Sequence, residues 1–401
     1  MIKISDLKIY NLILFLRAII LLAPITLLFY QYNGLSASEL FFFQGIFYLT
    51  SILVEVPVGY FTNNFSKKNL LIISFIIYLL VIISWLLFKG YYVILIGEIF
   101  CAISKVIMDN VVSGYLYDLL QHQDRETKMP KYFGYVNFSL ASGTAVAAIV
   151  GTFIFSKYGF STLLTTQALI IITSIFLLSL IPNIKRHMPL KDTFINSLHK
   201  FSKTIKTIFN NENVKYHISL SGFLTAYSIL FVLSFQLLII NTSLPIFIFG
   251  LIALTNHGIR ALASLFPSHI IKKYNLSQLA KILFALYSIA FLLILATYHT
   301  ENKILALASM ITICFFIGLQ LIFTILHISR AHKLVANNQR GSLMSVNNFI
   351  SRILSAIILL NSKLFMDKQF NFDIYYTILF LIFIIVASYL TYKIKALKVE
   401  Q

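Results

Sequence analysis

Twelve apolar stretches, each long enough to cross a lipid bilayer, follow one another along this chain. A membrane-spanning helix needs about 20 consecutive apolar residues, because lipid offers no hydrogen-bond partner to an unpaired backbone group. Hydrophobic residues make up 59% of the chain and charged residues 11%, which is unlike a soluble domain. The sequence therefore predicts an all-α polytopic membrane protein. Its twelve predicted transmembrane helices cover residues 9–30, 39–62, 69–88, 91–118, 132–155, 160–182, 216–241, 243–270, 276–298, 303–328, 341–366 and 372–392.

The formal net charge of +18 is distributed unevenly between the two predicted sides of the membrane. With a cytoplasmic N-terminus, 22 of the 32 Lys and Arg residues fall in inward-facing segments. The outward loops carry five, which are Lys89, Lys157, Lys303, Lys363 and Lys368. Positive residues are retained on the cytoplasmic side, so both termini are predicted to be cytoplasmic, in a bacterial inner membrane. The excess charge is thus a topology signal, and we expect no nucleic-acid partner.

The two cysteines and the first apolar stretch exclude some other classes of protein. Cys101 and Cys314 both lie in predicted spans, where they are expected to be small buried hydrophobes rather than disulfide or metal ligands. We therefore expect no metal site and no cofactor. The 22 residues of the first stretch exceed the apolar region of a signal peptide, which predicts an uncleaved first helix.

A basic polar segment, residues 183–215, divides the twelve stretches six and six. It carries seven Lys and Arg residues and only two acidic ones. Apolar residues recur in it at helical spacing, at Phe194, Ile195, Leu198, Phe201, Ile205 and Ile208. This pattern predicts an amphipathic linker helix on the anionic inner leaflet of the bilayer. We expect it to join two six-helix bundles, residues 1–182 and 216–401, in a duplicated transporter architecture that acts as a monomer.

Charged residues inside the predicted spans are the strongest functional signal. A charge at the bilayer centre costs at least about 2.5–3.5 kcal/mol, so each must face protein or water. On the fourth helix, Glu98, Lys105 and Asp109 fall within about 40° of one another at 100° per residue. They form either a neutralising ion pair that permits insertion or a substrate or proton site. Across all spans, the interior bases are Arg17, Lys105, Arg260 and Arg352, and the interior acids are Glu55, Glu98 and Asp109.

The excess of bases suggests an anionic or zwitterionic solute, because Arg makes bidentate contacts with carboxylate or phosphate. Arg17, Lys105, Arg260 and Arg352 are therefore candidate solute ligands, and Glu55, Glu98 and Asp109 are candidate proton carriers. Arg17 and Arg260 could instead extend toward the inner interface, whereas Arg352 is too deep for that. His257 and His327 also lie in spans, as satisfied polar residues or as coupling groups.

Three patches of the sequence resemble the major facilitator superfamily. The first, from Glu55 to Lys68, reads Glu-Val-Pro-Val-Gly-Tyr-Phe-Thr-Asn-Asn-Phe-Ser-Lys-Lys and is similar to the loop between helices 2 and 3 of that family. Its Glu-x-Pro-x-Gly beginning resembles one bacterial branch. The second patch is Gly97-Glu98 together with Tyr115-Leu-Tyr-Asp118, and the third runs from Arg340-Gly-Ser-Leu-Met-Ser345 to Arg352. The resemblance covers the whole chain in topology.

This resemblance implies a cytoplasmic gate at the inner ends of helices 2, 4 and 11. Lys67 or Lys68 would contact Asp118, and Asn63 would face the positive N-terminal end of helix 11, near Arg340. Asn63 stands where the family usually has aspartate, and Ser66 where it has glycine, whereas Gly59 matches. The glycine-proline motif of drug/proton antiporters is not intact in helix 5, where Gly143 and Gly151 remain without the proline. Small residues of this kind also serve close helix packing.

The expected function is secondary transport by alternating access, driven by protons or another coupling ion. The solute would be small, organic and anionic or amphiphilic, such as a carboxylate siderophore or a drug-like molecule. Export is slightly favoured over uptake by a nutrient symporter. No phosphate-cradling Gly-x-x-x-x-Gly-Lys motif is present. A membrane acyltransferase is a remote alternative, because its only support is the spacing of His187 and Asp192.

Overall fold

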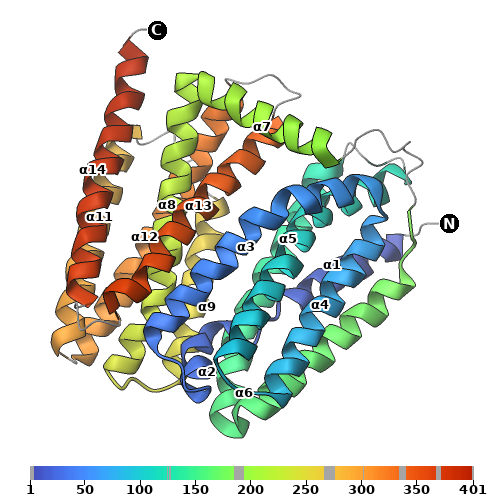
Figure 1. Cartoon of the computed structure of the whole chain (residues 1–401), viewed down its shortest axis with the longest axis horizontal. Helices are drawn as coiled ribbons and strands as arrows, with labels where there is room; N and C mark the ends of the chain where they lie inside the picture. Colours follow the sequence, from blue (N-terminus) through green and yellow to red (C-terminus); the bar gives the residue numbers. More distant parts are fainter. Residues whose placement is uncertain are drawn as a thin grey trace. The chain divides into compact units, whose positions relative to one another are not determined.

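The structure is a computed structural model that describes residues 4–123, 125, 128–184, 194–265, 276–300, 302–333, 340–366 and 372–399. These residues form helices and no strand, which confirms the predicted all-α class (Figure 1). Grouping by contacts divides the chain into two units. The first comprises Met1–Ser36 and Leu49–Leu198, and the second comprises Ala37–Tyr48 and His199–Gln401. The predicted boundaries at residues 182 and 216 remain predictions.

The helices follow the predicted spans closely. In chain order they are α1 Ile4–Ala18, η1 Ala23–Ile25, α2 Thr26–Tyr32, α3 Ala37–Asn64, α4 Lys67–Leu87, α5 Tyr91–Gln121, α6 Met129–Leu180, α7 Phe194–Asn210, α8 Glu212–Asn241, α9 Phe247–Leu265, α11 Leu276–Thr300, α12 Lys303–Lys333, α13 Arg340–Met366 and α14 Phe372–Val399. Over the described residues, nine helical segments are long and apolar enough to cross a membrane. The helices α9 and α13 are not among the nine, although they lie at the eighth and eleventh predicted spans. The predicted count of twelve is thus confirmed only in part.

The 52-residue helix α6 contains the fifth and sixth predicted spans. Gly159 separates its two arms, with φ of 77° and ψ of −175° inside an otherwise helical run. Only glycine adopts this backbone conformation readily, because it has no Cβ. The predicted division between residues 155 and 160 is therefore made by a single glycine.

The first predicted span is broken rather than continuous. The helix α1 ends at Ala18, and a 3₁₀ turn from Ala23 leads into α2. Pro24 is the cause, since proline has no N–H and its ring clashes with the carbonyl four residues earlier, here that of Ile20. The Ala23 N–H donates to the Ile20 carbonyl at 3.1 Å instead. The prediction of one helix over residues 9–30 is wrong on this point.

Within the first unit, α1 packs against α6 and α4 packs against α5. Tyr10 on α1 ties this core together. Its ring meets that of Tyr115 edge-on at 5.3 Å, and its hydroxyl donates to the Val112 carbonyl at 2.8 Å. The core of the unit thus joins the first membrane helix directly to α5.

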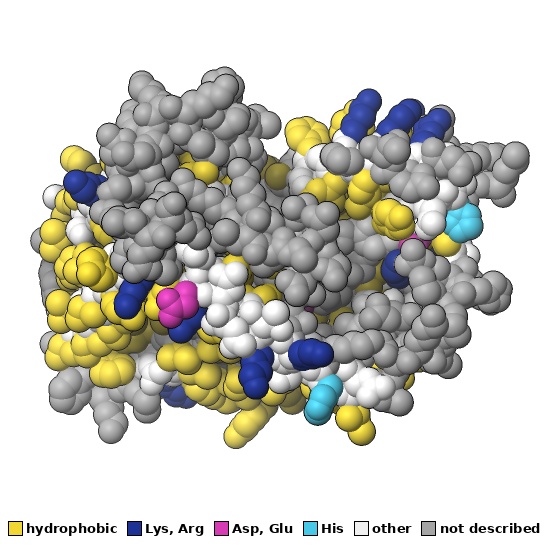
Figure 2. All heavy atoms as spheres, turned by 90° about the horizontal axis from the view of Figure 1, so that it is seen from above, with side chains coloured by type: hydrophobic (Ala, Val, Ile, Leu, Met, Phe, Trp, Pro, Cys, Tyr) yellow, Lys and Arg dark blue, Asp and Glu magenta, His cyan; other side chains and the backbone are white. Residues whose placement is uncertain are grey.

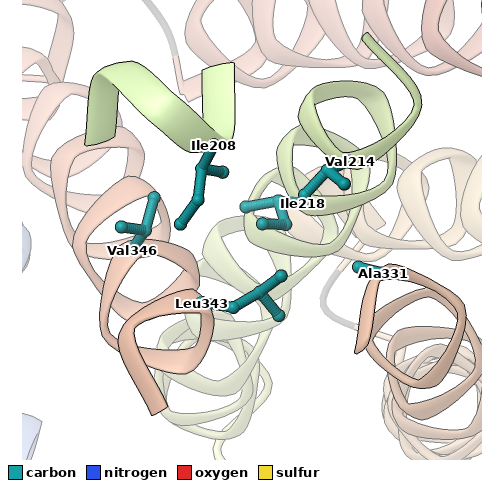
Figure 3. Packing of buried hydrophobic residues seen from close by; sticks show 6 residues of the cluster. All are labelled: Ile208, Val214, Ile218, Ala331, Leu343 and Val346. Carbon is teal, nitrogen blue, oxygen red and sulfur yellow. The ribbon is translucent and has the colours of Figure 1, made fainter. Parts of the chain in front are cut away.

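Within the second unit, α8 packs against α12 and α13, and the second half of α7 covers their ends. Ile208 of α7 is buried in a cluster with Val214, Ile218, Ala331, Leu343 and Val346 (Figure 3). Ile205 and Phe209 pack on the same cluster. Two further residues of the predicted apolar stripe, Ile195 and Leu198, are exposed. The stripe is therefore exposed near the start of α7 and buried near its end.

Basic residues accompany these apolar ones on α7. Lys203 and Lys206 are exposed on the helix whose Ile208 is buried. Figure 2 shows the molecule from above, where the Lys and Arg side chains that are drawn stand among hydrophobic ones and few acidic side chains are visible. This mixture suits the predicted contact with an anionic lipid surface.

Candidate functional site

An ion pair stands near the midpoint of α5. The Lys105 Nζ lies 2.6 Å from each carboxylate oxygen of Asp109, and the two side chains are 50% and 38% exposed. Lys105 is 14 residues from Tyr91 and 16 from Gln121, or about 20 Å from either end of the helix at 1.5 Å per residue. An exposed ion pair at this depth would be costly in lipid. The face of α5 that carries it therefore suits contact with water rather than with hydrocarbon.

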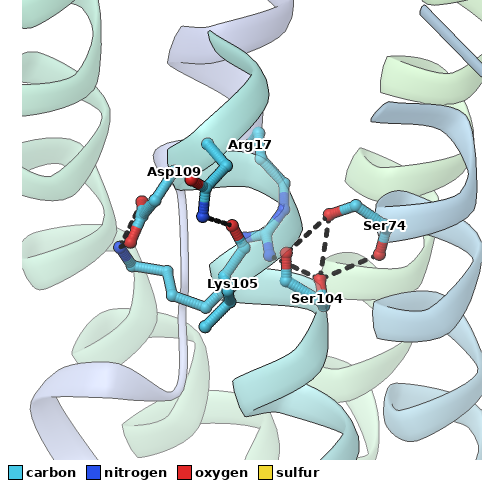
Figure 4. Close-up of polar contacts among 7 residues, drawn as sticks. Arg17, Ser74, Ser104, Lys105 and Asp109 are labelled. Atoms are coloured by element: carbon cyan, nitrogen blue, oxygen red, sulfur yellow. Dashed lines mark hydrogen bonds and ion pairs between the residues drawn. The ribbon is translucent and has the colours of Figure 1, made fainter. Parts of the chain in front are cut away.

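Arg17 lies behind this helix, on the side away from the ion pair (Figure 4). Its side chain is only 4% exposed. The guanidinium donates to the Ser104 Oγ at 3.3 Å and stands 4.2 Å from the centroid of the Tyr78 ring. Ser104 in turn exchanges hydrogen bonds with Ser74 of α4. Arg17 is thus enclosed by protein and does not extend to the inner interface, while its role as a solute ligand remains a prediction.

Glu98 is separated from the other two charges of the predicted stripe by its surroundings. It is 5% exposed and accepts a hydrogen bond of 2.6 Å from the hydroxyl of Tyr30, which belongs to α2. The angular spacing of Glu98, Lys105 and Asp109 does not set their exposure, because Glu98 is buried beside α2 whereas Lys105 and Asp109 are exposed. Glu98 is therefore buried against α2, and its role in proton transfer remains a prediction.

The predicted contact between Lys67 and Asp118 is present. The Lys67 Nζ lies 2.7 Å from the Asp118 Oδ2, and it also donates to the Gly114 carbonyl at 3.2 Å. Gly114 makes room for this side chain, since a Cβ there would lie 3.0 Å from the Lys67 Cε. The pairing of these two residues is confirmed, and their role as a gate remains a prediction.

Lys68, the alternative candidate for the contact with Asp118, binds two backbone carbonyls. Its Nζ donates to the carbonyls of Ser179 and Ile181 at 2.9 and 2.5 Å. These carbonyls lie at the C-terminal end of α6, where a cation compensates the negative end of the helix dipole. Tyr115 also donates to the Pro182 carbonyl, at 2.6 Å. The segment after α6 is therefore fastened to α4 and α5.

The remaining predicted gate and proton residues carry less information. Glu55 is half-buried on α3, and a Cβ at Gly59 would meet no atom within 4 Å. Asn63 and Arg340 belong to helices, but their side chains lie outside the described residues. His187, Asp192 and the acyltransferase spacing they form also lie outside them.

The second unit holds two predicted solute ligands. Arg260 on α9 is exposed and Arg352 on α13 is half-buried. Arg352 lies 12 residues from Arg340 and 14 from Met366, so it is near the middle of its helix. The depth of Arg352 in the bilayer remains a prediction.

His327 is not a lone histidine. Its Nδ1 lies 2.6 Å from the Nδ1 of His217, and both side chains are buried. His257 is half-buried on α9. Sequence reasoning missed His217 because the pair joins residues 110 positions apart.

Two further polar residues were missed in the first unit, Tyr30 and Gln167. Gln167 is 1% exposed and contacts the broken part of the first span through two hydrogen bonds. The only signal for it in the sequence is an amide side chain inside an apolar stretch.

Comparisons with known proteins agree with the fold. The family model described as the Major Facilitator Superfamily matches residues 9–359. No curated protein matches the chain in sequence. Among solved structures, the nucleoside transporter NupG is similar with a TM-score of 0.77 and 12% identity, covering 98% of this chain and 100% of that one. A D-xylose-proton symporter gives 0.72 and 14%, covering 97% of each chain. A bacterial homolog of the human lysosomal transporter Spinster gives 0.65 and 12%, covering 90% of this chain and 81% of that one.

Proposed function

Because the chain belongs to the Major Facilitator Superfamily, a family of multi-pass membrane transporters, we propose that it couples proton movement to transport of a small organic anion. The observation that carries this proposal is the exposed Lys105–Asp109 pair near the midpoint of α5. Charges at this depth are rare in membrane helices and mark solute or ion pathways. The pair supports a water-accessible face on which Lys105 contacts a negatively charged solute.

Glu98 is the proposed proton carrier. Its carboxylate is buried and held by the Tyr30 hydroxyl, whereas Asp109 is already neutralised by Lys105. A buried carboxylate that takes part in proton transfer gains or loses a full charge within protein, which is the property a proton carrier requires. Glu55 and Asp109 are secondary candidates for the same role.

Arg352 and Arg260 are the proposed solute ligands of the second unit. Both are guanidinium groups, which bind carboxylate or phosphate through two parallel hydrogen bonds. Arg17 is more enclosed than these two, since its guanidinium already contacts the Tyr78 ring and donates to the Ser104 hydroxyl. For Arg17 we therefore propose a supporting position rather than direct contact with solute.

The test is transport by the purified protein in proteoliposomes. Solutes are first chosen by a thermal-shift screen against anionic metabolites, siderophores and drugs. Flux is then measured with a pH-sensitive dye in the lumen, under an imposed pH gradient of either direction. We expect solute movement to change the lumenal pH and to collapse with a protonophore. Glu98→Gln should abolish the proton signal, and solute flux that is independent of any proton gradient contradicts the proposal.

The same vesicles decide the direction. As a finer part of the proposal, we propose export from a bacterial cytoplasm slightly ahead of uptake. Export predicts that the solute and the proton move in opposite directions. Movement in the same direction would instead identify an uptake symporter, as the printed name of the D-xylose neighbour describes that protein.

A further inference from the structure

The break in the first membrane helix leaves backbone groups without their helical partners. In a continuous helix the Leu21 N–H would donate to the Arg17 carbonyl, and the Ile19 carbonyl would accept from the Ala23 N–H. In this structure the Leu21 N–H donates to the side chain of Gln167, and the Ala23 N–H donates to the Ile20 carbonyl at 3.1 Å. Backbone groups left unpaired inside a membrane protein cost several kcal/mol each unless another group satisfies them.

Gln167 satisfies both groups with one side chain. Its Oε1 accepts from the Leu21 N–H at 2.7 Å, and its Nε2 donates to the Ile19 carbonyl at 2.9 Å. Gln167 is on the second arm of α6, nearly 150 residues away in sequence. A primary amide is suited to this task, because it carries an acceptor oxygen and a donor NH₂ group side by side at the end of one side chain.

Two glycines of the first arm of α6 lie against the backbone at and before the break. A Cβ at Gly143 would lie 2.3 Å from the Phe15 carbonyl oxygen, and one at Gly151 would lie 2.2 Å from the Leu21 carbonyl oxygen. The two backbones therefore touch directly, as small residues allow in membrane proteins. Both arms of α6 thus hold the stretch from Phe15 to Leu21.

The break lies between two polar contacts to α5. Before it, Arg17 donates to Ser104, and after it, Tyr30 donates to Glu98. The direction in which the chain leaves the break decides where Tyr30 points. Besides Tyr30, the described groups that interact electrostatically with Glu98 include Tyr78 from α4 and Cys101 from α5, and Arg17 contacts the Tyr78 ring.

We propose that Gln167 is a positioning residue for the Glu98 proton site. By fixing the Leu21 N–H and the Ile19 carbonyl, it sets the course of α2 and so places the Tyr30 hydroxyl against the carboxylate. The inference rests on the proposed function, in which Glu98 carries the proton. Gln167 itself touches neither the proton nor the solute.

The test follows the protonation of Glu98 in the full chain, reconstituted in lipid. Difference infrared spectra between the wild type and Glu98→Gln isolate the carboxyl band, and its amplitude is titrated against pH. Tyr30→Phe should move the midpoint upward by about one pH unit, because a hydrogen bond to the ionised form is lost. Gln167→Leu should move it in the same direction, and the double variant should move it no further than Tyr30→Phe alone.

A packing control separates positioning from general loosening. Ile171 is one turn beyond Gln167 on α6 and is 1% exposed, so Ile171→Ala weakens the same helix without removing the amide. We expect Ile171→Ala to lower stability and leave the midpoint unchanged. Gln167→Asn keeps the amide on a shorter side chain and should shift the midpoint less than Gln167→Leu. Should Gln167→Leu fail to fold, an unchanged midpoint in Gln167→Asn overturns the proposal, as does an equal shift in Ile171→Ala.

Hydrogen exchange separates the failure of this inference from the failure of the proposed function. The Leu21 amide should exchange about tenfold faster in Gln167→Leu, since loss of one hydrogen bond of about 1.4 kcal/mol allows local opening. Unchanged exchange overturns the role of Gln167 whatever Glu98 does. Absence of a titrating band at Glu98, with faster exchange at Leu21, contradicts the proton role of Glu98 and leaves Gln167 as the residue that holds the break.

Discussion

The two units are built from similar helices but fill their interiors differently. In the first, the described buried residues include a guanidinium, two carboxylates and an amide, at Arg17, Glu98, Asp118 and Gln167. In the second, the described buried residues include the His217–His327 pair but no carboxylate or guanidinium, and much of the interior is packed aromatic rings such as Tyr227, Phe231 and Tyr287. Each buried polar group of the first unit needs a specific partner, whereas rings need only shape and contact. The comparison suggests that the chemistry of coupling is concentrated in the first unit.

The largest effect on stability is expected at the Lys67–Asp118 pair. Lys67→Met leaves the Asp118 carboxylate, of which 4% is exposed, without its charged partner. Removal of one member of a buried pair typically costs about 3–5 kcal/mol, which should lower the midpoint of thermal unfolding in detergent. Lys105→Met is the matched control in the same unit, because its partner Asp109 is exposed. Equal losses in the two variants would contradict the distinction between buried and exposed pairs.

A smaller effect is expected where glycines allow close approach. Gly151→Ala places a Cβ 2.2 Å from a backbone oxygen in the first unit, whereas Gly222→Ala in the second meets the Ile350 Cγ2 at 2.8 Å. A side-chain methyl can rotate away and a carbonyl cannot, so Gly151→Ala should cost about 3 kcal/mol and Gly222→Ala less. Gly134→Ala is the control on α6, since no atom lies within 4 Å of its Cβ. Thermal unfolding of the three variants tests this order.

The same substitution should have opposite signs in the two units. The Tyr30 hydroxyl donates to Glu98, so Tyr30→Phe should destabilise the protein by about 1–2 kcal/mol. The Tyr287 hydroxyl is buried with no hydrogen-bond partner among the described residues, so Tyr287→Phe should be neutral or stabilising by about 1 kcal/mol. Paired thermal scans at one pH measure both. A loss of stability in Tyr287→Phe as large as in Tyr30→Phe would remove the proposed difference between the interiors.

The smallest effect on stability, and a large one on transport, is expected at Lys105. Exposed ion pairs contribute about 0–1 kcal/mol, so Lys105→Ala should unfold at nearly the wild-type temperature. Solute flux in proteoliposomes should nevertheless fall, because the cation on the exposed face of α5 is lost. Full flux in Lys105→Ala would show that the pair serves insertion only, which is the alternative left open by the sequence.

Local rules predicted much of the fold and part of the site. Apolar runs of about 20 residues gave the helix positions. The family resemblance implied that Lys67 or Lys68 contacts Asp118, and Lys67 makes this contact. The spacing of Glu98, Lys105 and Asp109 gave their common direction on α5 but not their exposure, because burial of Glu98 depends on which helices pack beside it, α2 among them. Pro24 is a sequence signal for the break in the first span. Hydropathy alone does not register it, because the residues around Pro24 form a continuous apolar run.

The partners of the broken span could not be read from the sequence. Gln167 and Leu21 are separated by 146 positions, and His217 and His327 by 110. Each pair depends on which helices become neighbours, which hydropathy does not specify. A polar residue in an apolar stretch shows that some partner must exist, and only the packed structure identifies it.

The single left-handed residue at Gly159 has a mechanical consequence for α6. No loop separates the two arms, so one arm cannot move far without displacing the other. A tilt of the arm that bears Gly143 and Gly151 is therefore transmitted to the arm that bears Gln167. All three residues contact the same stretch of the first helix, so a movement of either arm of α6 about Gly159 acts on that stretch.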